Sequence, residues 1–215
     1  MLKHCLSGVP APFGVLRVLG FAAIAILVGA DAAPALPRQA PPPAPPKPPV
    51  QAPAAAAAVP GAIPGIRAFT HVSDRVTLGG AVDPSAYPLL KQAGYAAVIN
   101  LRTAAEAGAD IEGAKAAAGA AGLTYIHVPF DKAGLTAGTV DTFLKAVSDP
   151  ANQPVLVHCA GAVRASLMWA IKRAVQDGWP VEEALGEFPW LARSVPEAYR
   201  TFAHEYIKKR GREGF

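Results

Sequence analysis

The sequence is poor in cysteine, in aromatic residues and in charge. Its 215 residues include two cysteines, 7% aromatic residues and 17% charged residues, with a net charge of +4. Two cysteines cannot build the disulfide framework of a small secreted domain, and Cys5 lies in the N-terminal segment, so Cys159 has no partner within a folded domain. The densest basic run, residues 208–212, has no interleaved aromatics and is the end of a predicted helix. No nucleic-acid partner is therefore predicted.

One apolar stretch is uncharged for longer than the others, and it lies near the N-terminus. It covers residues 19–30, follows basic residues, and leads into Ala30-Asp31-Ala32, which has the small-x-small pattern of a signal peptidase site. Residues 1–32 are therefore predicted to be an export signal. If the stretch extends back to Val15, an uncleaved membrane anchor is the alternative. Both alternatives predict a periplasmic location, with membrane contact only through this segment.

Residues 33–65 are dominated by proline and alanine. Twelve of the 22 prolines lie between Pro34 and Pro64, and only two residues in that stretch are charged. Such a composition cannot bury a core, and Pro-rich chains favour extended polyproline conformations. The segment is predicted to be a disordered linker that holds a domain away from a membrane or cell wall.

From residue 66 the sequence has short apolar runs that alternate with amphipathic segments, which is typical of α/β domains with a mostly parallel sheet. Residues 66–215 suit a single domain. Five strands are predicted, at residues 68–71, 75–78, 96–101, 124–128 and 154–158. The third and the fifth are nearly continuous apolar runs, so they are predicted to be central in the sheet.

Helices are predicted between and after these strands. Apolar residues recur at helical spacing in three stripes, and each stripe is predicted to face the core. The stripes are Val140, Phe143, Leu144 and Val147; Leu167, Met168, Ile171, Ala174 and Val175; and Tyr199, Phe202, Ala203, Tyr206 and Ile207. Thr103 and Glu106 have the spacing of a helix capping box, but Gly108 and Gly113 weaken the helix that would follow, so it is predicted to begin at Asp110.

The segment around Cys159 carries the chemistry. A buried strand runs into a turn of small residues and then into an amphipathic helix; the loop comprises His158, Cys159, Ala160, Gly161, Ala162, Val163 and Arg164. Successive amides in such a turn, with the positive end of the helix, favour an oxyanion. The same groups and Arg164 would lower the pKa of Cys159 and make it a nucleophile, while the Arg164 fork suits two phosphate oxygens. A buried structural cysteine is the alternative.

His158-Cys159, followed by four residues and Arg164, resembles the loop of the Cys-based phosphatase superfamily. The chain more closely resembles the bacterial beta-lactamase-hydrolase-like, or DUF442, phosphatase-like domains, in which the spacing is also four residues. The matching motifs are Val98-Ile99-Asn100-Leu101-Arg102, Ala121-Gly122-Leu123-Thr124-Tyr125-Ile126-His127-Val128-Pro129, Leu135-Thr136 and Gly178-Trp179-Pro180-Val181-Glu182-Glu183-Ala184, and the resemblance covers residues 68–187. It implies a protein-tyrosine-phosphatase-like α/β fold with a mostly parallel sheet of four to five strands flanked by helices, a cysteinyl-phosphate intermediate, and neither a metal nor another cofactor.

In the mechanism that the resemblance implies, a second group protonates the leaving oxygen while Cys159 attacks phosphorus. Asp131 is the candidate, because it follows Val128-Pro129-Phe130 at the end of a strand and lies in a loop that contains Gly134. A solvated loop carboxylate is the alternative. Asp141 is a poorer candidate, since a carboxylate on a rigid helix cannot close over a substrate.

Two further residues are candidates for supporting the site. His158 is predicted to hold the loop by hydrogen bonds to backbone groups, with a simple buried imidazole as the alternative. Arg102 could reach the site from the end of a neighbouring parallel strand, or it could anchor the region of Asp110 and Glu112.

The loop departs from the family pattern at two positions. Ala162 stands where the family usually has glycine, and a positive φ at that position would strain the loop. Ala165 stands where many members have a serine or threonine that aids departure of the thiolate, although Ser166 is the next residue. Slow or absent activity is compatible with both departures.

Three functions are compatible with this loop. The first is an exported phosphatase that acts on a phosphorylated small molecule or a phosphoprotein. The second is a rhodanese-like sulfurtransferase, which also uses Cys, four residues and Arg, and which would carry a persulfide on Cys159. The third is an inactive anion-binding module, which Ala162 and Ala165 favour. The upstream strands and Asp131 favour the phosphatase, whereas the substrate and the oligomeric state cannot be assigned from the sequence.

Overall fold

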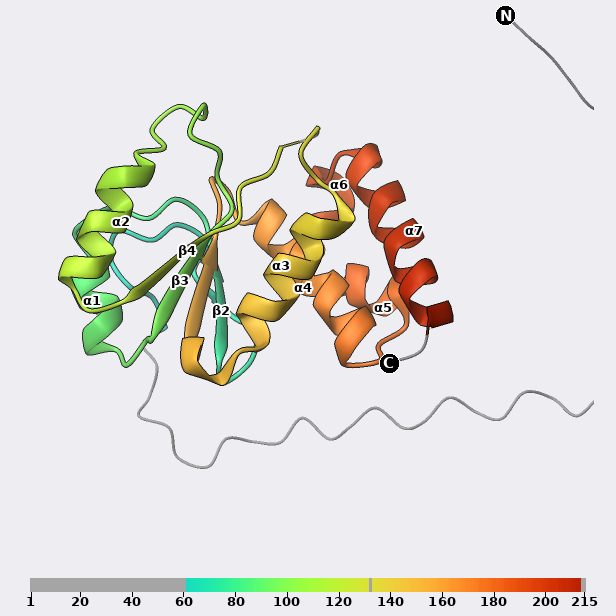
Figure 1. Cartoon of the computed structure of the whole chain (residues 1–215), viewed down its shortest axis with the longest axis horizontal. Helices are drawn as coiled ribbons and strands as arrows, with labels where there is room; N and C mark the ends of the chain where they lie inside the picture. Colours follow the sequence, from blue (N-terminus) through green and yellow to red (C-terminus); the bar gives the residue numbers. More distant parts are fainter. Residues whose placement is uncertain (1–60, 132, 214–215) are drawn as a thin grey trace, which may run out of the picture. The chain divides into compact units, whose positions relative to one another are not determined.

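Figure 1 shows the computed structural model, which describes residues 61–131 and 133–213. The predicted export signal, residues 1–32, and nearly all of the predicted linker lie outside the described residues. Within the described residues, no helix is both long enough and apolar enough to cross a membrane.

A five-stranded sheet forms the centre of the described region. Its strands are β1 (Thr70–His71), β2 (Val76–Gly79), β3 (Ala97–Asn100), β4 (Thr124–His127) and β5 (Val155–His158). Their order across the sheet is β1-β2-β5-β3-β4, and every neighbouring pair is parallel except β1 with β2. The predicted α/β fold with a mostly parallel sheet is confirmed. The two strands that were predicted to be central, β3 and β5, are each paired on both sides and completely buried.

Helices cover both faces of the sheet, because alternate residues of the central strands point to opposite sides. Val98 and Leu156 face a core that includes α1 (Ala86–Gln92) and α2 (Ile111–Ala120). Ile99 and Val157 face a larger core built from α3 (Ala137–Ser148), α4 (Val163–Gln176), α5 (Val181–Gly186), α6 (Leu191–Ser194) and α7 (Glu197–Glu213). Figure 1 shows α1 and α2 at one side of the sheet and the other helices at the opposite side.

The predicted helical stripes are core in the structure. All four apolar residues of the stripe on α3 are buried, and so are those of the stripe on α4 except Ala174, which is partly buried. On α7, Phe202 is only partly buried, whereas Tyr199, Ala203, Tyr206 and Ile207 are buried. As predicted, α2 is capped by Asp110, whose side chain accepts a hydrogen bond from the Gly113 amide. Helix α1 and the short helices α5 and α6 were not predicted from periodicity, because they are too short to show a repeat.

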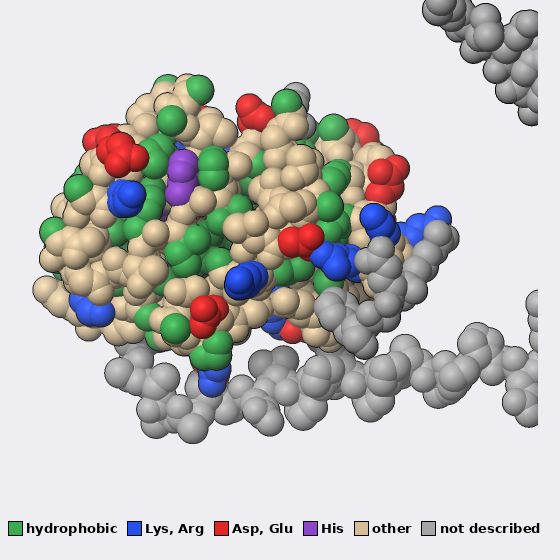
Figure 2. Space-filling model, viewed as in Figure 1, with side chains coloured by type: hydrophobic (Ala, Val, Ile, Leu, Met, Phe, Trp, Pro, Cys, Tyr) green, Lys and Arg blue, Asp and Glu red, His purple; other side chains and the backbone are tan. Residues whose placement is uncertain are grey.

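The carboxyl ends of the parallel strands lie at one edge of the sheet, which is where open α/β sheets bind ligands. The loops that follow β2, β3, β4 and β5 therefore leave the sheet at the same edge. Acidic and basic side chains are interspersed over the face of the molecule drawn in Figure 2, without a continuous stripe of one charge among the coloured residues.

The folded region begins earlier than residue 66. Ile63, which belongs to the predicted linker, is only 3% exposed and packs in the core that includes α1. Its carbonyl oxygen also accepts a hydrogen bond from the Ile66 amide, at 3.2 Å. The composition of residues 33–65 concealed this residue, because one isoleucine among prolines and alanines has no periodic partner. The boundary of the domain is therefore corrected to about residue 63.

We expect Ile63→Ala to lower the free energy of unfolding by about 2–4 kcal/mol, because it removes buried methyl groups from a packed core. Urea denaturation followed by circular dichroism measures this change. Pro64→Ala is the matched control, since Pro64 is exposed and should leave the midpoint nearly unchanged. Equal midpoints for Ile63→Ala and the wild type would return the boundary to residue 66.

Candidate active site

The loop after β5 is anchored to the segment that follows β2. The Cys159 amide donates to the Gly79 carbonyl at 3.2 Å, and the Ala160 carbonyl accepts from the Ala81 amide at 3.0 Å. Gly80 lies between these two contacts, and a Cβ at this position would be 3.0 Å from the Ala160 oxygen. Glycine at 80 thus lets the two backbones approach, which fixes Cys159 at the end of the central strand. The cysteine is 2% exposed and forms no disulfide.

Ala162 has the left-handed conformation that the sequence analysis identified as the source of strain. Its φ is +65° and its ψ is −10°, and it is the residue that precedes the first turn of α4. A side chain at this conformation costs on the order of 1 kcal/mol relative to glycine. The loop therefore keeps its shape at some expense of stability, although the usual glycine is absent.

Several amides of this loop are available to an anion. Among the described residues, no main-chain carbonyl accepts from the amides of Ala160, Gly161, Val163, Arg164 or Ala165. Three of them belong to the first turn of α4, where the helix dipole adds to the attraction for negative charge. By contrast, the Cys159 amide is bonded to Gly79 and does not contribute.

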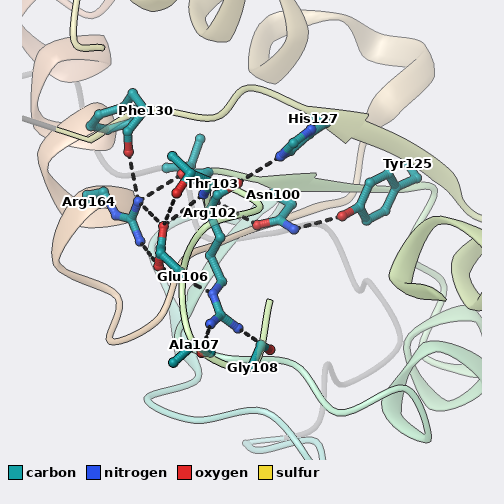
Figure 3. A network of polar contacts seen from close by, with 11 residues as sticks. Asn100, Arg102, Thr103, Glu106, Ala107, Gly108, Tyr125, His127, Phe130 and Arg164 are labelled. Atoms are coloured by element: carbon teal, nitrogen blue, oxygen red, sulfur yellow. Dashed lines mark hydrogen bonds and ion pairs between the residues drawn. The ribbon is translucent and has the colours of Figure 1, made fainter. Parts of the chain in front are cut away.

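Arg164 is held by a carboxylate and two carbonyl groups (Figure 3). Its Nη1 donates to Glu106 Oε1 at 2.7 Å, to the Phe130 carbonyl at 2.8 Å and to the Leu101 carbonyl at 3.1 Å. Its Nη2 donates to Glu106 Oε2 at 2.7 Å. The contact with Glu106 is therefore a two-point ion pair along one edge of the guanidinium.

The second edge of the Arg164 guanidinium donates to no oxygen of the described residues. Guanidinium has five N–H donors, and Nη1 together with one N–H of Nη2 accounts for the contacts above. Within the described part of the chain, no oxygen acceptor is found for Nε or for the remaining Nη2 hydrogen, and the Cys159 side chain is the further group that interacts with this guanidinium. These two donors point from the same edge, in the spacing that matches two oxygens of a phosphate. Glu106 thus orients Arg164 and leaves its anion-binding edge free of oxygens of the described residues.

Charge balance at the Arg164–Glu106 pair stabilises both ions. Burial alone would raise the pKa of Glu106, but hydrogen bonds from Arg164 and the Thr103 amide, with the charges of Arg164 and Arg102, hold it at about 2. Burial alone would lower the pKa of Arg164, but Glu106 and a thiolate at Cys159 raise it above its ordinary value. The influence of Cys159 indicates that its sulfur lies close to the Arg164 guanidinium.

His158 is a buried neutral imidazole. It is 3% exposed, and neither ring nitrogen forms a well-oriented hydrogen bond with another described residue. Burial, together with the charges of Arg102 and Arg164, lowers its pKa to about 4, although the backbone at Cys159 and Gly80 partly opposes this shift. The ring interacts with backbone groups of Cys159 and Gly80, as predicted for a residue that holds the loop, but without well-oriented hydrogen bonds, so this role and the simple buried imidazole both stay predictions. A neutral His158 cannot supply a positive charge to a thiolate.

Arg102 does not reach towards Cys159, and it does not anchor Asp110 and Glu112. Its Nη1 and Nη2 donate to the carbonyls of Gly108 and Ala107 at 3.0 and 2.7 Å, and its Nε donates to Glu106 at 3.4 Å (Figure 3). Arg102 thus reaches the site only through Glu106, and its other bonds go to residues just before Asp110, because the loop after β3 curls back onto the arginine that begins it. Arg102 thus fixes the loop that presents Glu106 to Arg164.

Asp131 and Ser166 lie near the site in different ways. Asp131 is exposed, and its Oδ1 accepts from the amides of Ala133 and Gly134, both at 2.9 Å, so the carboxylate shapes its own loop. It follows Phe130, whose carbonyl is bonded to Arg164. Ser166 is fully buried on α4, and its hydroxyl oxygen accepts from Trp190 Nε1 at 3.3 Å. Ser166 makes no hydrogen bond to Cys159.

Sequence reasoning missed Glu106 as a site residue. The spacing of Thr103 and Glu106 was a visible signal, and the reciprocal contact exists, since the Thr103 amide donates to Glu106 Oε1 at 2.8 Å. However, no helix follows directly, because residues 104–108 form turns and a bend. The same carboxylate instead serves Arg164, which is 58 positions away in the sequence. Among the described residues, no group of three or more His, Cys, Asp and Glu side chains could hold a metal ion.

The fold and the loop define the class of protein. A mostly parallel sheet, with a cysteine at the end of its central strand and an arginine in the first turn of the next helix, is the arrangement of the Cys-based phosphatase fold. The family model described as "Beta-lactamase hydrolase-like protein, phosphatase-like domain" matches residues 68–176, which is half of the chain. The chain belongs to this family.

Solved structures and curated proteins agree with this assignment. A putative phosphatase (DUF442) of Shewanella putrefaciens is 26% identical with a TM-score of 0.59, covering 68% of this chain and 95% of that chain. The core catalytic domain of a PP-IP phosphatase of S. cerevisiae shares the fold, with a TM-score of 0.53 at 18% identity, covering 67% and 91% of the two chains. A beta-lactamase hydrolase-like protein of Xylella fastidiosa is 30% identical over 48% of this chain, and the match spans only 24% of that protein.

We expect Ala162→Gly to raise the free energy of unfolding by about 0.5–1 kcal/mol, because glycine adopts the left-handed conformation without a Cβ clash. Ala165→Gly is the matched control, since the same substitution in the first turn of α4 should destabilise the protein by about 1 kcal/mol. Denaturant midpoints of the two variants measure the difference. A destabilised Ala162→Gly would show that Ala162 is not strained.

The low pKa of Glu106 predicts an acid dependence of stability. Because its pKa in the folded protein, about 2, lies below the ordinary value of 4.5, this contribution is complete above about pH 4.5 and disappears as the pH falls through 2. We expect Glu106→Gln to lose stability at neutral pH and to show a shallower decline between pH 5 and 2 than the wild type. Urea midpoints over that range measure the slope, and parallel slopes would contradict the ion pair.

Proposed function

We propose that this protein is an exported phosphatase that hydrolyses a phosphate monoester through a cysteinyl-phosphate intermediate. The observation that carries the proposal is the position of Arg164, which Glu106 orients and whose guanidinium interacts with the Cys159 side chain at the start of α4. Free amides in the same loop offer further donors to a tetrahedral anion. A buried structural cysteine would not need an arginine prepared in this way.

In the proposed first step, the Cys159 thiolate attacks phosphorus, and the bond between phosphorus and the ester oxygen breaks. The leaving oxygen takes a proton, and phosphorus becomes bonded to Cys159. In the second step, water attacks phosphorus, the sulfur–phosphorus bond breaks, and inorganic phosphate leaves with the thiolate restored. The loop amides and Arg164 bind the phosphoryl oxygens in both steps, which is where electrostatic stabilisation has its largest effect.

The thiolate has to be stabilised without help from His158, because a buried imidazole with a pKa of about 4 is neutral near pH 7. The first-turn amides of α4 and the charge of Arg164 are the groups that remain for this task. Glu106 is bonded to the Nη1 and Nη2 edge of the guanidinium and therefore fixes its orientation.

Asp131 is the proposed donor of the proton to the leaving oxygen. It lies in the loop that joins β4 to α3. The carbonyl group of the preceding residue, Phe130, accepts a hydrogen bond from Arg164. The Oδ1 of Asp131 is engaged by two amides of the loop. A carboxyl group on such a loop can approach a substrate while its backbone stays attached to the site.

Export and the substrate class are proposals from the sequence. The apolar stretch at residues 19–30 and the Pro-rich segment after it suggest a domain held outside the cytoplasm on a spacer, with a phosphorylated small molecule or a phosphoprotein as substrate. The curated relatives are much longer than the region that matches, so activities of those whole proteins are not carried over to this chain.

We expect the full chain to hydrolyse p-nitrophenyl phosphate, with turnover abolished in Cys159→Ser and lowered by about 10²-fold or more in Asp131→Asn. Release of p-nitrophenol measures both. Asp149→Asn is the matched control: Asp149 is also exposed and also accepts from the amide two residues on, but it precedes β5 and lies at the opposite edge of the sheet. It should keep wild-type turnover.

The two alternative functions predict different assay results for the wild type and the same variants. Transfer of sulfur from thiosulfate to cyanide, dependent on Cys159 but insensitive to Asp131→Asn, would favour the sulfurtransferase and contradict the phosphatase. Phosphate binding that requires Arg164, without turnover at any pH, would favour the inactive anion-binding module.

A further inference from the structure

The chain continues beyond the region that matches the family model, and this continuation packs against the active-site helix. The family model ends at residue 176, the end of α4, and helices α5, α6 and α7 follow. All three pack on α4, and their buried residues belong to the same core as Cys159 and Ala165. The C-terminal helices are therefore part of the surroundings of the loop.

Two aromatic residues of this continuation contact the site. Trp190 donates from Nε1 to the hydroxyl of Ser166, two positions after Arg164. Tyr199, near the start of α7, packs edge to face on the ring of Phe130, with centroids 5.8 Å apart. The Phe130 ring lies 5.9 Å from the Arg164 guanidinium carbon, and the Phe130 carbonyl accepts from Arg164. Phe130 thus lies in contact with both Arg164 and Tyr199.

The phenol of Tyr199 lies within the electrostatic field of the whole site. Burial raises its pKa above the ordinary value of 10; Arg164 opposes this shift, whereas the charges of Asp131, Glu106 and Cys159 add to it. These are the four ionisable groups that the proposed reaction uses or depends on. Near neutral pH the phenol is uncharged, so it keeps its proton and can donate it in a hydrogen bond.

The Tyr199 hydroxyl has no protein partner to compete for that proton. Tyr199 is 6% exposed, and its hydroxyl forms no hydrogen bond with any residue that the structure describes. Tyr206, two turns further along α7, behaves differently, because its hydroxyl donates to Asp141 at 2.5 Å. Of these two phenols on α7, Tyr199, which packs on Phe130, is the one whose hydroxyl hydrogen is free to donate.

We propose that the Tyr199 hydroxyl donates a hydrogen bond to an oxygen of the phosphate group bound at Cys159 and Arg164, so that the C-terminal helices complete the binding site. This inference rests on the proposed function, since it needs a phosphate at the loop. Loop amides and Arg164 supply donors from β5 and α4, and Tyr199 supplies a neutral donor from the side of Phe130. Tyr199 is then a substrate-binding residue that lies outside residues 68–176, the region matched by the family model.

The test measures phosphate binding without requiring turnover. Alkylation of Cys159 by iodoacetamide is followed in the full chain at increasing concentrations of inorganic phosphate, and protection gives the dissociation constant. We expect Tyr199→Phe to weaken phosphate binding roughly tenfold, because one hydrogen bond to a charged group is lost while the ring packing on Phe130 is kept. Urea midpoints of the variant and the wild type should agree, which separates binding from stability.

Tyr206→Phe is the matched control, since it removes a phenol hydroxyl from the same helix at a position bonded to Asp141. It should bind phosphate as the wild type does. If Tyr199→Phe also binds phosphate like the wild type, while Arg164→Lys binds it much more weakly, the inference is overturned and the proposed function stands. If phosphate does not protect Cys159 in the wild type, both are overturned.

Discussion

The active site depends on one guanidinium that ties three loops together. Arg164 begins α4, and it is bonded to Glu106 and the Leu101 carbonyl from the loop after β3 and to the Phe130 carbonyl from the loop after β4. The loops after β3 and β4 are also bonded to each other, since the Phe130 amide donates to the Leu101 carbonyl at 3.4 Å, and Arg164 ties both of them to the start of α4. Because the Arg164 side chain is only 13% exposed, the pair with Glu106 is held in a medium that strengthens it, and removal of either partner would leave the other charge uncompensated.

The same pair explains how the site can be electropositive and still bind in a defined geometry. A lone arginine beside a thiol could fold onto the loop amides or turn to solvent, whereas the two-point contact with Glu106 fixes the plane of the guanidinium. Arg102 acts one step further away, by holding the turn that carries Glu106. The two arginines also account for the neutral state of His158, since their charges add to burial in lowering its pKa.

Stability and function are in tension at Ala162. Its left-handed conformation orients the first turn of α4 towards the loop, and the cost of that conformation is met by the packing of β5 and α4 in the core. Glycine would relieve the strain but would also loosen the loop in the unfolded and folded states. The C-terminal helices add to this packing, because α5, α6 and α7 cover α4 on the side away from the sheet and bring Tyr199 and Trp190 to the site.

The sequence by itself determined the class of fold, the two central strands and the loop with Cys159 and Arg164, because apolar runs and small-residue turns are local patterns that the backbone must obey. The resemblance to the family, which usually has glycine at this position, pointed to strain at Ala162, and the structure supplied the positive φ. The sequence could not assign Glu106, whose capping-box spacing with Thr103 is real but whose main partner is 58 positions away. The tertiary structure likewise decided the bonds of Arg102, the neutral state of His158 and the packing of Tyr199 on Phe130. Contacts between distant segments leave no periodic pattern in the sequence. The burial of Ile63 was also decided by the tertiary structure, since only its packing against α1 distinguishes it from the predicted linker.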